Sequence, residues 1–448
     1  MEVKNTLDTI QKEIKNTITY NIWLYKKFHE SILKEEWDLL YKIYLEYLDF
    51  IHNSLKNNIG LKFIFLKTIE KNISGSIYPL LVYLRGSELF GSAKYPNEII
   101  LKENEFFRLT FIPAKNSSNL SLFHVGGILP YSDKIFRFLP EINFFNYFIE
   151  NGISVYAMEL KGNKFQIPNY NSLTLNKILN SIEDFSEVAY KHNQNKKMIL
   201  EGYCGLGIQS LSYIMLYPEQ AEKKFSLATL FVSPIDGATC GTLSNAMNEI
   251  PNYLIDLTFF LSNIVGELPF TSTQFVQDLS FNSLISKTFL GLFYSGWKKE
   301  KYQINDLWNK DLTLEQKKDI AGTYWISALN GYLYPVPLDL AKFYTRLFKQ
   351  GINNDGILPW KIQNQNLDIK TILEKTTLKI IGFYGEQDRL VPSTTANILK
   401  NILQERYIHV IHSNAGHISY VLTPESWIKN NKKSLSPNPI DLIKNELL

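Results

Sequence analysis

The chain has very little cysteine: Cys204 and Cys240 are the only two among 448 residues. Two cysteines cannot form the disulfide framework of a small secreted domain, so a reducing compartment is expected. The N-terminus lacks the apolar stretch of a signal peptide, and the sequence has no run of about 18 uncharged apolar residues. We therefore expect a cytoplasmic protein without a membrane-spanning helix.

An excess of charge of one sign is also missing. The 47 basic and 44 acidic residues give a net charge of +3 at pH 7, without a dense stripe of lysine and arginine. This balance argues against a nucleic-acid-binding protein. Because 45% of the residues are apolar, the whole length is expected to be globular, with more than one structural unit.

The pattern of apolar residues changes along the chain. Residues 1–105 are predicted to be a helical N-terminal region, because apolar residues recur there at three- and four-residue spacing. Residues 106–448 are predicted to be a catalytic domain, because strands alternate with helices as in a doubly wound, mostly parallel sheet. The predicted strands are 106–114, 120–127, 154–160, 196–204, 226–233, 377–385 and 406–413. Residues from about 234 to 370 break this alternation, and we expect a mostly helical lid inserted over the carboxyl ends of the strands.

The stretch "EGYCGLGIQSL" places Cys204 at a sharp bend between a strand and an amphipathic helix. This is the nucleophile position of the α/β-hydrolase fold, where the usual pattern is G-x-S/C-x-G. Gly202, Gly205 and Gly207 surround the cysteine, but Leu206 stands where the pattern has its second glycine. The backbone N–H of Gly205 is expected to be one oxyanion-hole donor, and the second to come from the loop near Gly127.

The fold requires an acid and then a histidine after the nucleophile in the chain. "IIGFYGEQDRLVP" supplies Asp388 after a predicted strand, and "YIHVIHSNAGHIS" supplies His417 after the last one. The sequence therefore predicts a triad of Cys204, Asp388 and His417. Glu386 and Asp236 remain alternative acids, the latter because it follows the strand 226–233.

The other six histidines are weaker candidates for the triad. His124 ends a predicted strand, and we expect it either to line the site or to be buried. His409 and His412 lie on the last predicted strand instead of the loop after it. The remaining three are expected to be ordinary helix residues: His29, His52 and His192.

Several motifs resemble those of the polyhydroxyalkanoate synthases, the polyester polymerases of bacteria. The resemblance spans roughly residues 120–425. It includes "LEGYCGLGIQSLSYIMLYPEQ" before "ATLFVSPID", "PVPLDLAKFYTRLFKQGI" before the segment of Asp388, and "SNAGHISYVLTPESW" around His417. The resemblance implies that Cys204 carries the growing acyl chain, that His417 activates it, and that Asp388 helps to activate the incoming hydroxyl.

The resemblance also implies the substrate and partners. The substrate would be an (R)-3-hydroxyacyl thioester of coenzyme A and the product a polyester, with no metal or redox cofactor. The enzyme would work in the cytoplasm at a granule surface, as a homodimer or with a partner subunit. The family has glutamine after its cysteine and then two glycines, whereas this chain has Gly205, Leu206 and Gly207. An intracellular polyester depolymerase, a thioesterase or another α/β-hydrolase using the same triad is the alternative interpretation.

Overall fold

The computed structural model describes most of one compact unit of the protein. The described segments are 94–116, 119–126, 133–137, 143–161, 167–241, 337–388, 390–413, 415–417, 419–422, 427 and 434–447, with single residues within 41–66, 244–260 and 312–313. The chain divides into a unit of residues 1–87 with 282–328 and a unit of residues 88–281 with 329–448. All the helices and strands given below belong to the second unit. Within the described residues, no helix has both the length and the apolar character needed to cross a bilayer.

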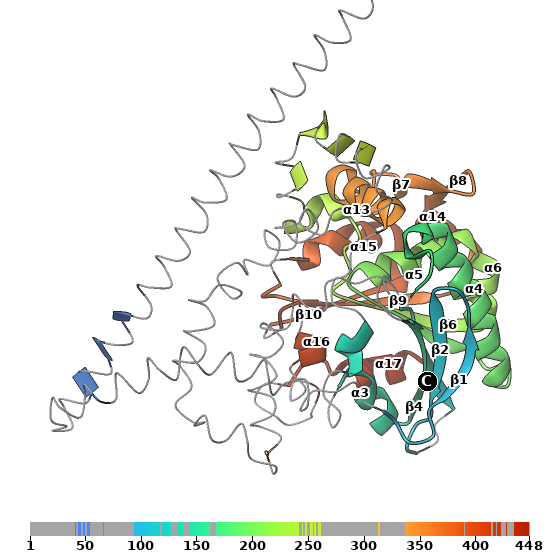
Figure 1. The fold of residues 1–448 in the computed structure, drawn as a ribbon, viewed down its shortest axis with the longest axis horizontal. Helices are drawn as coiled ribbons and strands as arrows, with labels where there is room; N and C mark the ends of the chain where they lie inside the picture. The colour runs from blue at the N-terminus through green and yellow to red at the C-terminus, as the bar shows by residue number, and fades with distance from the viewer. Residues whose placement is uncertain are drawn as a thin grey trace, which may run out of the picture. The chain divides into compact units, whose positions relative to one another are not determined.

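An eight-stranded sheet forms the centre of this unit (Figure 1). Its strand order is β1-β2-β4-β3-β5-β6-β9-β10. β2 runs antiparallel to both of its neighbours, and the pairs from β4 to β10 are parallel. The strands are β1 (Ile99–Glu103), β2 (Phe107–Ile112), β3 (Leu120–His124), β4 (Ile153–Leu160), β5 (Met198–Tyr203), β6 (Phe225–Phe231), β9 (Lys379–Gly385) and β10 (Tyr407–His412). All seven strands predicted from residue 106 onward are thus confirmed.

Helices connect the parallel strands and cover both faces of the sheet. They are α3 (Phe144–Glu150), α4 (Leu175–His192), α5 (Gly205–Leu216), α6 (Pro218–Lys224), α13 (Leu338–Gln350), α14 (Lys370–Lys375), α15 (Asn397–Leu403), α16 (Ser419–Leu422) and α17 (Pro439–Leu447). Short 3₁₀ turns are η1 (Asp133–Arg137), η2 (Tyr170–Ser172), η3 (Gly237–Thr239), η5 (Ser393–Ala396) and η6 (Gln404–Arg406). Right-handed crossovers place α4, α5 and α6 on one face and α3 on the other, because the chain reverses direction across the sheet after β4.

This reversal creates the topological switch point of the sheet. β3 lies between β4 and β5, and the connection that leaves β3 runs on the opposite face of the sheet from the connection that leaves β5. Ligands of open α/β sheets bind at such a point, outside the carboxyl ends of the strands. All six residues of β5 are buried, as is typical of a central parallel strand covered on both faces. The strand order, the antiparallel β2 and the sharp turn after β5 give the chain the α/β-hydrolase fold.

Two sequence predictions need correction. Residues 1–105 are not helical to their end, because Ile99–Glu103 forms the edge strand β1. No residue of β1 is buried, so the apolar alternation that reveals a strand is absent.

The insertion predicted for 234–370 also contains more than helix. It includes the helix α13, but also a hairpin of β7 (Ile357–Ile362) and β8 (Gln365–Asp368). The hairpin turn places Gln363 and Asn364 at positive φ, without the Asn-Gly pair that usually marks such turns. Most of the predicted lid between 242 and 336 lies outside the described residues.

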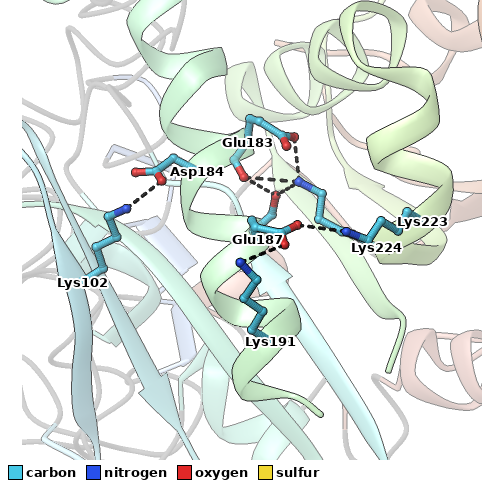
Figure 2. Close-up of polar contacts among 8 residues, drawn as sticks. Lys102, Glu183, Asp184, Glu187, Lys191, Lys223 and Lys224 are labelled. Atoms are coloured by element: carbon cyan, nitrogen blue, oxygen red, sulfur yellow. Dashed lines mark hydrogen bonds and ion pairs between the residues drawn. The ribbon is translucent and has the colours of Figure 1, made fainter. Parts of the chain in front are cut away.

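A buried lysine joins α4 to α6 on the side of the sheet that carries α5 (Figure 2). The Lys224 side chain is fully buried, and its ammonium donates to Glu183 Oε2 at 2.6 Å and to Ser186 Oγ at 2.9 Å. Burial lowers the pKa of Lys224, and the carboxylate of Glu183 opposes this effect. One turn further along α4, Glu187 contacts the more exposed Lys191 and Lys223.

We expect Glu183→Gln to lower the free energy of unfolding by about 3 kcal/mol, because it leaves a buried ammonium without its counter-charge. Glu187→Gln is the matched control on the same helix, and its exposed ion pairs predict a loss below about 1 kcal/mol. Urea unfolding of the two variants measures both values. Equal losses would contradict the structural role given to the buried pair.

Candidate active site

Cys204 lies at the turn between β5 and α5 in a strained backbone conformation. Its φ of 50° and ψ of −128° are unfavourable for a residue with a side chain. The backbone of the turn is fixed by hydrogen bonds from Cys204 N to Phe231 O (2.8 Å) and from Gly207 N to Cys204 O (3.0 Å). The side chain is partly exposed, whereas the thiol of Cys240 is buried. The strand therefore presents one accessible sulfur at the switch point of the sheet.

Gly207, instead of a glycine at position 206 as in the G-x-S/C-x-G pattern, allows the strand and the helix to pack closely at this turn. A Cβ on Gly202 would lie 2.7 Å from the Cα of Gly207, and a Cβ on Gly207 would lie 1.8 Å from Ser233 Oγ. Both positions therefore need glycine for strand and helix to approach each other. Leu206 is instead buried in the core. The departure from G-x-C-x-G thus leaves the tight turn intact.

The structure brings Asp388 and His417 together. Asp388 follows β9, and its Oδ2 is 2.8 Å from His417 Nδ1. Its other oxygen, Oδ1, accepts hydrogen bonds from the N–H groups of Leu390 and Val391, both at 2.9 Å. Since the side chain of Asp388 is fully buried, these bonds hold the carboxylate in one orientation toward the imidazole.

Tyr203 ties the histidine loop to the strand that carries the cysteine. Its hydroxyl donates to the backbone carbonyl of His417 at 2.5 Å, and the rings of Tyr203 and His417 meet edge to face. A second link, from Gln387 N to Ala415 O at 3.0 Å, joins the loops after β9 and β10. No local pattern marks Tyr203 in the sequence, because its contact spans more than 200 residues.

The side chain of His417 also interacts electrostatically with that of Cys204. Burial lowers the pKa of His417, but the charges of Asp388 and Cys204 and the hydrogen bonds to both side chains raise it, to about 10. Because Nδ1 faces Asp388, Nε2 is the nitrogen that remains for the thiol of Cys204. The imidazole beside Cys204 therefore favours its protonated form at neutral pH.

The raised pKa predicts a pH dependence of stability. The pKa of His417 is about 10 in the folded protein, against an ordinary value of 6.5. Its stabilising contribution is then complete below about pH 6.5 and is lost as the pH rises toward 10. Urea unfolding measures the difference in the free energy of unfolding between wild type and His417→Gln, and this difference should shrink progressively over this pH range. A difference that is constant or grows with pH would contradict the ion pair.

The alternative acids lie elsewhere. Glu386 is exposed at the end of β9. Asp236 accepts a hydrogen bond from Ile352 N at 3.1 Å and holds the chain after α13. Neither side chain has a recorded contact with His417, so Asp388 is the acid that the structure places beside the imidazole.

The other histidines have different surroundings. His412 is buried, with its ring nitrogens at Tyr420 Oη (2.8 Å) and Pro437 O (2.9 Å). The ring of His409 contacts those of Tyr384 and Tyr407. His192 contacts Tyr156, His52 is exposed in a helix, and His29 lies outside the described residues.

His124 does not line the site but forms a fully buried pair with Glu201. Its Nδ1 contacts Glu201 Oε2, and three phenylalanine rings surround the imidazole. Burial raises the pKa of Glu201 and the neighbouring imidazole lowers it. The pair joins the end of β3 to β5, shortly before the turn at Cys204. It therefore ties the start of the predicted oxyanion loop to the strand of Cys204.

Of the two predicted oxyanion donors, the structure describes only Gly205. Gly205 begins α5, where the first N–H groups of the helix have no partner inside it and the helix dipole favours negative charge. Gly127 lies outside the described residues. Among the described residues, no three His, Cys, Asp or Glu side chains gather in a way that could hold a metal ion.

Comparison with known proteins gives no family for this chain. No protein-family model and no curated protein matches it. An epoxide hydrolase from Bacillus megaterium is 13% identical, with a TM-score of 0.41 over 77% of this chain and 99% of its own. A carboxylesterase from Bacillus subtilis is 12% identical, with a TM-score of 0.38 over 78% and 94%. The thioesterase domain from the curacin biosynthetic pathway is 11% identical, with a TM-score of 0.39 over 74% and 96%. Similarities this low say nothing about a substrate, and the site is interpreted from its own geometry.

Proposed function

We propose that this protein is an acyl-transfer enzyme that forms a covalent acyl thioester on Cys204. The observation that carries the proposal is the hydrogen bond between His417 and Asp388, on an imidazole whose pKa is also raised by Cys204 at the switch point of the sheet. His417 would move the proton, and Asp388 would fix its tautomer and stabilise the imidazolium. The partly exposed thiol on a strained turn is the nucleophile.

In the first half-reaction, the Cys204 thiolate attacks the carbonyl carbon of an acyl thioester. A carbon–sulfur bond forms, and the carbonyl electrons move to the oxygen, which the Gly205 N–H would stabilise. When this intermediate collapses, the thiol of the donor leaves and takes the proton from His417. The acyl group then remains on Cys204.

In the second half-reaction, an acceptor O–H gives its proton to His417 Nε2 while its oxygen attacks the acyl-cysteine. The new ester or acid is released, and the thiolate and imidazolium are restored. A cysteine nucleophile suits a thioester donor, because the sulfur that attacks and the sulfur that leaves are energetically matched. We propose an (R)-3-hydroxyacyl coenzyme A thioester as the donor, on the resemblance of residues 120–425 to the polyester synthases.

Two acceptors follow from this chemistry. With the hydroxyl of a second hydroxyacyl group as acceptor, the enzyme polymerises, as the resemblance implies. With water as acceptor, it is a thioesterase or polyester depolymerase. The second candidate is favoured by the α/β-hydrolase fold and by Gly205 and Leu206 at positions where the polyester synthases have other residues.

Incubation of the purified protein with (R)-3-hydroxybutyryl coenzyme A tests both candidates. The polymerase predicts released coenzyme A together with insoluble polyester, whereas the hydrolase predicts released coenzyme A together with free 3-hydroxybutyrate. Both require that release depends on Cys204. Release no faster than with the Cys204→Ala variant would contradict the proposed function for this donor.

A further inference from the structure

Tyr344 of α13 lies against the first residue of α5, beside the cysteine. A Cβ added to Gly205 would be 2.6 Å from the Tyr344 hydroxyl oxygen and 3.1 Å from the ring carbon that bears it. Gly205 has no side chain, so the phenol occupies the space that a side chain after the nucleophile would fill. Helix α13 thereby brings a polar group to the end of α5 where the backbone N–H groups are free of intrahelical bonds.

Gln209 fixes the direction of this phenol. Gln209 is fully buried one turn along α5, and its Nε2 donates to the Tyr344 hydroxyl oxygen at 2.9 Å. The hydroxyl oxygen is thus an acceptor for Gln209, and its own proton points elsewhere. Among the described residues, the structure records no acceptor for that proton. A polar donor at this position is therefore available to a substrate.

Tyr344 is close enough to Cys204 for the charge of the sulfur to affect its pKa. Burial raises the pKa of Tyr344 well above its ordinary value, and the negative charge of Cys204 raises it further. The phenol consequently keeps its proton at neutral pH. In the proposed reaction, negative charge moves from the sulfur to a carbonyl oxygen. A neutral hydrogen-bond donor at this position can stabilise that oxygen.

We propose that the Tyr344 hydroxyl donates a hydrogen bond to the carbonyl oxygen of the acyl group attacked by Cys204. It would act beside the Gly205 N–H as a side-chain donor of the oxyanion hole, supplied by α13 from the segment predicted as the lid. The proposal rests on the proposed function, since it requires a substrate carbonyl at Cys204. Gln209 is its positioning residue, because it contacts the phenol and orients it.

The test separates oxyanion stabilisation from thiol reactivity. Single-turnover acylation by (R)-3-hydroxybutyryl coenzyme A passes through an oxyanion, whereas alkylation of Cys204 by iodoacetamide does not. We expect Tyr344→Phe to slow acylation by about 100-fold and to leave alkylation within about twofold of wild type. Tyr217→Phe is the matched control, because Tyr217 follows α5 at its other end, bonds Asn180 on the surface, and should affect neither rate.

Gly205→Ala gives a second variant, in which Tyr344 itself is not replaced. Its Cβ would displace the Tyr344 hydroxyl, so acylation should again fall by about 100-fold. In the Tyr344→Phe background the same change should add less than about threefold, because the oxygen it displaces is already gone.

Three results would overturn the inference. One is acylation of Tyr344→Phe within about threefold of wild type. Another is an equal fall in acylation and alkylation, which would place the effect on the thiolate or on folding. The third is full additivity of Gly205→Ala and Tyr344→Phe. If wild type itself is not acylated although iodoacetamide alkylates Cys204, the proposed function fails, and the inference with it.

Discussion

Replacing Cys204 with alanine should lower the release of coenzyme A from (R)-3-hydroxybutyryl coenzyme A by at least about 10⁴-fold. The change removes the only atom that can carry the acyl group in the proposed mechanism. The change should have little effect on folding, because alanine at this position adopts the same positive φ as the cysteine it replaces. The measurement is the initial rate of coenzyme A release, followed by chromatography.

Cys240→Ala is the matched control for this variant. The second cysteine is buried, and its sulfur lies 3.4 Å from Thr395 Oγ1, so the control variant should keep the wild-type rate within a few-fold. A Cys204→Ala protein that keeps more than about a tenth of the wild-type rate would contradict covalent catalysis at this position.

Replacing Asp388 with asparagine should give the second largest effect, a loss of about 10³- to 10⁴-fold. The amide oxygen can still accept from Leu390 N and Val391 N, so the loop after β9 is expected to keep its conformation. The amide nitrogen would then face His417 Nδ1 and donate to it. The proton of the neutral imidazole would move to Nε2, which could no longer take a proton from the thiol or the acceptor.

Glu386→Gln is the control for this prediction, since Glu386 was the other acid in the same sequence motif. It is exposed, and its variant should retain full activity. The measurement compares the rates of coenzyme A release of the two variants and their far-ultraviolet circular dichroism. If Glu386→Gln is inactive and Asp388→Asn is active, the acid of the triad has been assigned wrongly.

The sequence alone was sufficient for seven of the eight strands of the central sheet and for the order of the three site residues. A strand such as Lys379–Gly385 is buried from its second residue to its last, so it appears in the sequence as an apolar run. Cys204, Asp388 and His417 each follow such a run, and the fold gathers strand ends at one edge of a sheet. Local patterns therefore predicted the pairing of Asp388 with His417.

What the sequence did not reveal depends on long-range contacts or on weak local signals. The edge strand Ile99–Glu103 buries no face, and the hairpin turn at Gln363 and Asn364 lacks glycine. The contact of Tyr344 with Gly205 joins segments about 140 residues apart, and no local pattern marks it. A glycine after the nucleophile was the available signal, since it makes room for a side chain from elsewhere.

Some of the differences between this chain and the polyester synthases that its sequence resembles lie at the turn after Cys204. Gly207 approaches Gly202, so the leucine at 206 does not disturb the strand-to-helix turn. Gly205 admits the Tyr344 phenol, so the polar group at the site comes from α13. We expect these changes to affect which acceptor the acyl group meets and to leave its attachment to Cys204 unaltered.

Locating the acyl group after a brief reaction tests this account most directly. The protein would be mixed with (R)-3-hydroxybutyryl coenzyme A, quenched in acid within one turnover, digested and analysed by mass spectrometry. The account predicts one hydroxybutyryl group on the peptide of Cys204, removable by neutral hydroxylamine as a thioester is. An acyl group on another residue would contradict it. Release of coenzyme A without acylation of Cys204 would contradict it as well.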